Sequence, residues 1–238
     1  MRGDAALRQP DVLHAFGDGV FVLEQEPAST GNKCRSCSAN GWGEGAPVLI
    51  RCTLRGMDPH AVHVELERAR ATFHELLDGS CDADLHRRSN GTRWTNQQLL
   101  FHMLLGYLIV RALGVLVRVF GRLPVGASWP FAWLLNSATK PFDVINYLGS
   151  CMGGAVLSPQ HMGALFDRVV AALHRRLDAE DEADLARGMY YPTRWDPFFR
   201  NFMTLADVYH FPTQHFDFHR RQLTLGEPQP LRDLDEGQ

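Results

Sequence analysis

Apolar residues recur at intervals of three and four in four long stretches of the chain, and this spacing places them on one face of an α-helix. The first stretch predicts a helix over residues 59–78, with Asp58 as its N-cap and Pro59 in its first turn. Its apolar positions are Val62, Leu66, Ala69, Phe73 and Leu76. One continuous apolar stripe of this kind indicates a helix that packs against a core.

Capping signals mark the starts of three further helices. Thr95 with Gln98, and Thr204 with Asp207, have the spacing of a capping box, and Ser158 followed by Pro159 is typical of a helix start. The predicted helices run from about Thr95 to Phe120, from Ser158 to the acidic run DAEDEAD, and from about Thr204 to Leu223. We expect Pro212 to kink the last of them.

The second of these helices contains an apolar segment, residues 99–120, that is long enough to cross a bilayer. Its arginines argue against a membrane span. Arg111, Arg118 and Arg122 fall within about 40° of one another on the helical wheel, on the face opposite His102. A single polar stripe opposite an apolar face is typical of a bundle helix in a soluble protein.

Four amphipathic helices without convincing alternating strands predict an all-α fold, a four-helix bundle over residues 57–224. The connection over residues 121–157 is too long for a hairpin, and its apolar stretches predict short helices that cover one end of the bundle. Residues 1–56 are rich in Gly, Ser and Asn and predict a disordered extension that contributes little to folding. Residues 225–238 are expected to form a flexible tail.

Composition narrows the function classes. With 45% hydrophobic and 21% charged residues, the composition predicts one globular domain. The formal charge of -3 does not favour binding to nucleic acid or to a membrane surface. Its five cysteines are scattered and no secretory leader pattern is evident, so we expect a cytoplasmic protein. Cys34 and Cys37 form a CxxC without a second pair and are interpreted as free thiols. Cys151 is the best thiol nucleophile candidate, but no base is evident beside it, and a small buried cysteine is the favoured interpretation.

Three histidines form a candidate metal site. His215 and His219 lie one helical turn apart, the spacing at which two imidazoles of one helix can chelate a metal. His102 lies on the apolar face of its helix, where a buried imidazole needs a partner. Three such ligands leave coordination positions open for water or substrate, as catalytic sites do. Gln222 lies within about 20° of His215 on the wheel and could orient a ligand or the bound water.

Other candidates are set aside on geometry. Eleven histidines give roughly one pair at helical spacing by chance, and His60 with His63 is interpreted as such an accident. His210 is about 140° from His215 on the wheel, and Asp217 about 200°, so neither is expected at the site. The chain contains no GxSxG, GxxxxGK[ST], HExxH or dinucleotide fingerprint.

Two segments, RSNGTRWTNQQLLFHMLLGYL (Arg88–Leu108) and LADVYHFPTQHFDFHRRQL (Leu205–Leu223), resemble the histidine-bearing helices of the DinB-like superfamily, which includes YfiT-like proteins. The resemblance covers about residues 57–224. It implies a four-helix bundle, often a dimer, that binds zinc, nickel or a similar divalent ion such as manganese or iron. The positions that match the family pattern are Trp94, His102, His215, His219, Gln222 and Leu223.

Three functions are compatible with such a site. The leading hypothesis is a metal-dependent enzyme that transfers a low-molecular-weight thiol to an electrophilic small molecule held by the apolar connection. The second is a hydrolase that uses metal-bound water, but no Asp or Glu adjacent to the ligands is expected to serve as its general base. The third is a non-enzymatic stress-response or interaction protein in which the metal braces the bundle.

Overall fold

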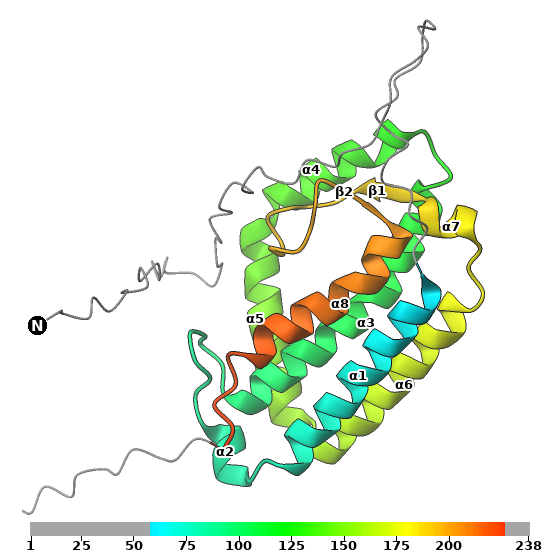
Figure 1. The fold of residues 1–238 in the computed structure, drawn as a ribbon. Helices are drawn as coiled ribbons and strands as arrows, with labels where there is room; N and C mark the ends of the chain where they lie inside the picture. The colour runs from blue at the N-terminus through cyan, green and yellow to red at the C-terminus, as the bar shows by residue number, and fades with distance from the viewer. Residues whose placement is uncertain (1–57, 227–238) are drawn as a thin grey trace, which may run out of the picture.

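The computed structural model describes residues 58–226, and within them four long helices form a bundle (Figure 1). These helices are α1 (Pro59–Asp78), α3 (Asn96–Phe120), α6 (Pro159–Leu177) and α8 (Leu205–Arg220). The α3 helix packs against α6 and α8, and α1 packs against the same two helices. The predicted all-α four-helix bundle is thus confirmed. The predicted extension over residues 1–56 and most of the predicted tail lie outside the described residues.

The long helices begin where the capping signals place them. The carboxylate of Asp58 accepts from the N–H of His60, and the hydroxyl of Ser158 accepts from the N–H of His161. The α3 and α8 helices open with the two capping boxes expected at Thr95 and Thr204. The α8 helix has Pro212 in its interior and ends at Arg220, earlier than predicted.

Aromatic rings from all four long helices meet at the centre of the bundle. Phe73 of α1, Tyr107 of α3, Phe166 of α6 and Phe216 of α8 are fully buried. The ring of Phe166 lies 4.5 Å from that of Phe73 and 4.7 Å from that of Tyr107, measured between centroids. Aromatic pairs at this distance add to the stabilisation from burial, so this cluster fixes how the four helices meet.

The connection between α3 and α6 contains a short 3-10 turn, η2 (Val125–Ser128), followed by α4 (Trp129–Ser137) and α5 (Thr139–Val156). The expectation that short helices cover one end of the bundle was wrong for α5, which is 18 residues long and packs against α3. Gly154 explains the close contact, because a Cβ at this position would lie 2.8 Å from the Cα of Gln98. The connection is therefore an additional long helix beside α3.

The sequence patterns also missed several short elements. Strands β1 (Gly188–Tyr190) and β2 (Phe202–Thr204) pair antiparallel just before α8. The helices α2 (Asp82–His86) and α7 (Glu182–Ala186) are one turn long. None of these segments is long enough to establish a hydrophobic period, which is why periodicity did not reveal them.

The apolar helix α3 is the one described helix long and apolar enough to cross a membrane, and half of its most apolar window is buried inside the bundle. Its apolar residues are therefore explained by its contacts with α5, α6 and α8. Arg111 and Arg122 are exposed, as predicted. Arg118 departs from the prediction, because it is partly buried and pairs with Glu180.

The bundle core yields a test of the packing. We expect Leu173→Ala, at a position that is 1% exposed, to lower the free energy of unfolding by about 2–5 kcal/mol, because it removes buried methyl groups and leaves a cavity. Leu148→Ala, at a position that is 51% exposed, is the matched control and should change the free energy by less than about 0.5 kcal/mol. Urea unfolding of both variants measures the difference, and equal losses would contradict the assigned core.

Candidate metal centre

The start of α3 and the end of α8 are tied together by a buried asparagine. The side-chain amide of Asn96 donates to the carbonyl of Asp84 at 2.8 Å, and its oxygen accepts from the N–H of Thr224 at 3.1 Å. Asn96 is fully buried, so these bonds satisfy polar atoms that would otherwise be costly. The N–H of Asn90 also donates to the carbonyl of Gln222 at 2.7 Å.

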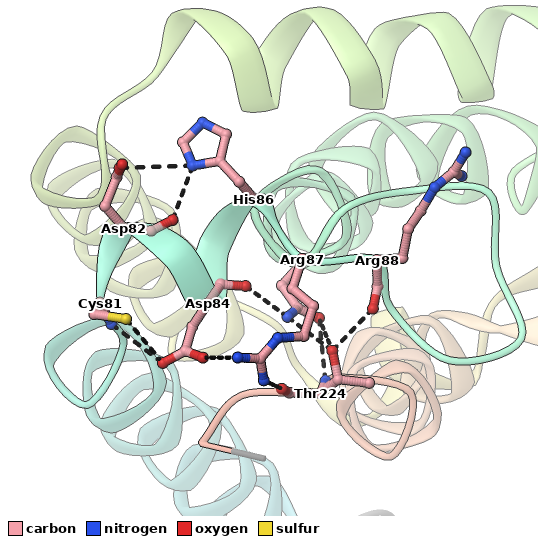
Figure 2. Close-up of polar contacts among 8 residues, drawn as sticks. Cys81, Asp82, Asp84, His86, Arg87, Arg88 and Thr224 are labelled. Carbon is pink, nitrogen blue, oxygen red and sulfur yellow. Dashed lines mark hydrogen bonds and ion pairs between the residues drawn. The ribbon is translucent and has the colours of Figure 1, made fainter. Parts of the chain in front are cut away.

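Figure 2 shows the surrounding contacts, which join α2 to the segment after α8. The Arg87 guanidinium pairs with Asp84 at 3.0 Å and donates to the carbonyl of Thr224 at 3.0 Å. The hydroxyl of Thr224 donates to the carbonyl of Arg88 at 2.9 Å. These contacts join the start of α3 to the end of α8. The second turn of α3, which carries His102, therefore lies beside the last turns of α8.

The three predicted histidines meet at this level. Nε2 of His102 lies 3.2 Å from Nε2 of His215, and one ring nitrogen from each of His102, His215 and His219 falls within 4.8 Å of the others. All three side chains are buried, with exposed fractions of 6%, 5% and 8%. Among the described residues they form the one group of three or more His, Cys, Asp or Glu side chains so close together.

Neighbouring side chains fix which nitrogen of two of these rings carries the proton. The Ser150 hydroxyl of α5 donates to the carbonyl of Asn146 at 2.8 Å, so its oxygen accepts the Nδ1–H of His102 at 3.2 Å. The amide oxygen of Gln222 accepts the Nδ1–H of His219 at 2.7 Å. In both rings the proton is on Nδ1, and Nε2 is left as a lone pair. The predicted proximity of Gln222 to a ligand histidine is therefore observed, although its partner is His219.

Packing also fixes the ring orientations. The Trp94 ring lies over that of His102, with centroids 4.5 Å apart and planes 28° apart. Gly106 makes room for His215, because a Cβ at this position would lie 2.8 Å from the Nδ1 of that ring. Nδ1 of His215 has no hydrogen-bond partner among the described residues. Its Nε2 lies 3.2 Å from Nε2 of His102, so Nε2 is the nitrogen that faces the centre of the group.

Burial keeps the rings neutral. It lowers the pKa of His219 to about 4 and lowers the pKa of His102 and of His215 well below the ordinary value. Neutral imidazole is the form that binds metal ions. Two nitrogens held about 2.0–2.1 Å from one tetrahedral ion lie roughly 3.3 Å apart, which agrees with the observed separation of His102 and His215. The donor set therefore fits a divalent metal ion.

An acidic residue that the sequence analysis did not predict lies beside the group. Oδ2 of Asp196 lies 3.7 Å from Nε2 of His215, and its Oδ1 accepts from the N–H of Phe198 at 2.8 Å. Burial raises the pKa of Asp196 to about 7. The expectation that no Asp or Glu lies near the ligands was wrong, because it considered only residues on α8. Asp196 lies between β1 and β2, where no helical period relates it to His215.

The residues excluded by the helical wheel lie elsewhere. His210 pairs with Glu65 at 2.9 Å, and Asp217 pairs with Arg68 at 2.7 Å. His63 contacts His174 of α6. Cys151 is a free thiol that is partly, not fully, buried. Cys34 and Cys37 lie outside the described residues.

The fold and this site together define a class of protein. It is a helical bundle in which two long helices place three histidines at a buried centre. A family model for the DinB superfamily matches residues 65–223, and the chain belongs to that superfamily. Comparisons with curated proteins and with solved structures found no match. The family assignment supports the fold and a buried three-histidine group compatible with a divalent metal.

The site predicts a specific pattern of metal loss. Replacing His102, His215 or His219 singly by alanine should abolish stoichiometric binding at this centre, since each ring supplies one of its three nitrogens. His210→Ala is the control and should retain binding, because His210 is bonded to Glu65. Elemental analysis after dialysis measures the content. A metal content per chain that is the same in all three single variants as in the unaltered protein would contradict the assignment.

The neutral state of the rings predicts a pH dependence of stability in metal-free protein. Because the pKa of His219 falls from 6.5 in the unfolded chain to about 4 in the folded one, the unfolded chain binds more protons between these values. The stability from this ring is therefore full above pH 6.5 and is lost as the pH falls toward 4. His219→Gln should reduce the slope of unfolding free energy against pH in this window. Asp196 is present in both the unaltered protein and the variant, so its titration contributes equally to the two slopes. A slope that is the same in both proteins would contradict the burial of a neutral His219.

Proposed function

We propose that this protein is a divalent-metal-dependent enzyme that transfers a low-molecular-weight thiol to an electrophilic small molecule. The observation that carries the proposal is the convergence of three neutral imidazoles next to a buried carboxyl group, Asp196. All three nitrogen ligands are uncharged, so none of them offsets the charge of a cation. Imidazole nitrogen suits zinc and nickel best, and manganese or iron less well.

When bound, the ion would hold the sulfur of the thiol and favour its thiolate form near neutral pH. The chain contributes the other parts. Ser150 and Gln222 orient two of the ligand rings. The N–H of Phe198 holds Oδ1 of Asp196, which leaves Oδ2 directed at the site.

Asp196 is the proposed proton acceptor. The thiol proton would pass to the Asp196 carboxylate as the sulfur binds at the site. The thiolate sulfur would then form the bond to the electrophilic carbon, and the leaving group would depart with the bonding electron pair. Burial raises the pKa of Asp196 to about 7 without an ion, and a nearby cation would favour its carboxylate form, which is the form that accepts a proton. The position beside His215 and the backbone bond from Phe198 together support this role.

A hydrolase is the second candidate, and Asp196 is the observation that favours it. The same carboxylate is placed to take a proton from an attacking water molecule. The non-enzymatic alternative requires a metal that only braces the bundle, with Asp196 or another group closing its coordination. A cytoplasmic location and a homodimer belong to the proposal as well, and neither a nucleic acid nor a membrane is proposed as partner.

Activity assays on metal-loaded protein distinguish these three functions. We expect turnover of chlorodinitrobenzene that requires glutathione, cysteine or mercaptoethanol, and that disappears when a chelator removes the metal. Asp196→Asn should lower kcat by about 100-fold or more with the metal content unchanged, because a positioned general base contributes on this scale. Asp217→Asn, at a surface carboxylate paired with Arg68, is the matched control and should retain activity.

Two results would redirect the proposal. Metal-dependent hydrolysis of nitrophenyl acetate without any thiol would favour the hydrolase. A protein that binds metal stoichiometrically, melts at a higher temperature when loaded and turns over neither substrate would favour the structural role.

A further inference from the structure

Two histidines meet on the other side of the bundle, at the seam between α1 and α6. Nδ1 of His63 lies 2.5 Å from Nδ1 of His174. The ring centroids are 4.7 Å apart, much farther than the nitrogens, and the ring planes are within 12°. The two nitrogens therefore face each other from the near edges of the rings.

Each ring is held from behind by a carboxylate. Nε2 of His63 lies 3.0 Å from Oδ1 of Asp178, and Nε2 of His174 lies 2.8 Å from Oε1 of Glu67. Carboxylates only accept hydrogen bonds when ionised, so both Nε2 atoms carry protons and donate them. Both Nδ1 atoms are then left with lone pairs directed at each other. Two lone pairs at this distance repel unless a cation lies between them.

We propose that His63 and His174 form a second divalent-metal site, in which the ion replaces the single proton that the pair otherwise shares. A histidine that binds a metal usually donates its other N–H to a carboxylate, and here both rings do so. Glu67 and Asp178 place negative charge at the outer nitrogens, although Glu67 shares its charge with Arg70. Arg70 also pairs with Asp167.

The site has room to adjust to an ion. Two nitrogens on one tetrahedral ion lie roughly 3.3 Å apart, so on binding the rings must separate by about 0.8 Å and tilt until both lone pairs point at an ion beside the line that joins the nitrogens. The side chains are 28% and 20% exposed, and water can therefore fill the remaining coordination positions. Zinc, nickel and copper are the ions that imidazole nitrogens favour, with copper bound most tightly. Binding releases the shared proton to solvent.

This site is distinct from the buried centre, because its residues belong to α1 and α6, whereas the other three histidines belong to α3 and α8. An ion bound here would link α1 directly to α6 across 111 residues of sequence. A ligand that binds only the folded chain stabilises it, so the ion would act as a clip between the two helices.

The test counts zinc ions bound per full-length chain by equilibrium dialysis. We expect two for the unaltered protein, and one for His63→Gln and for His174→Gln. His161→Gln changes an α6 histidine that bonds only to Ser158 in the described contacts, and it should leave two. A double variant with His102→Ala and His219→Ala should retain one ion, so loss of the buried centre is distinguished from loss of the seam site.

A spectroscopic measurement covers the case in which the double variant does not fold. Zinc-loaded protein with copper(II) added at one equivalent should give an electron paramagnetic resonance spectrum with coupling to two imidazole nitrogens, and His63→Gln should remove it. One zinc ion per chain, unchanged by His63→Gln and His174→Gln, would overturn the proposal and leave a pair that shares only a proton. Two zinc ions per chain in each of the single variants His63→Gln and His174→Gln would overturn it as well.

Discussion

Burial of three uncharged imidazoles in the bundle is the constraint on which the rest of the site depends. A ring without water must find a partner for each nitrogen or leave one unsatisfied. His102 and His219 satisfy Nδ1 through Ser150 and Gln222, and this choice leaves Nε2 facing inward. The Nε2 atoms of His102 and His215 then lie 3.2 Å apart, and Oδ2 of Asp196 lies 3.7 Å from Nε2 of His215. The group is compatible with a divalent cation, which would take the inward nitrogens as ligands.

Three parts of the fold position the buried imidazole rings. The α5 helix supplies Ser150, and Gly154 lets α5 approach α3 closely enough for the contact. The α3 helix supplies Gly106, which leaves space for the His215 ring. The junction around Asn96 sets the level of α3 against α8. A long connection that looked like a cover for the bundle is thus part of the site.

Helical periodicity and capping residues were sufficient to predict the bundle and the three histidines, because both depend on relations within one helix. The spacing of His215 and His219 fixes a common face, and the apolar neighbours of His102 fix its burial. Contacts between segments distant in sequence could not be predicted in this way. Asp196 lies in a loop without a period, and His174 lies 111 residues from His63. The pair of His60 and His63 was judged within α1 alone, so the partner on α6 was missed.

Burial also distinguishes the two histidine groups chemically. The seam rings have carboxylates at both outer nitrogens, so negative charge already lies beside a cation bound there. The buried rings have neutral partners and one nearby acid, Asp196, which is largely protonated below pH 7 without an ion.

A neighbouring positive charge favours the ionised form of a carboxyl group, so Asp196 would lose its proton as a divalent ion entered. One uncompensated positive charge would then remain in a region sheltered from water, which is costly unless an anion joins it. The buried centre therefore favours the capture of one further anionic ligand. A thiolate or a hydroxide would meet that requirement, so within the proposed function the charge balance favours an anionic nucleophile over a purely structural ion, and the requirement for an added thiol decides between sulfur and oxygen.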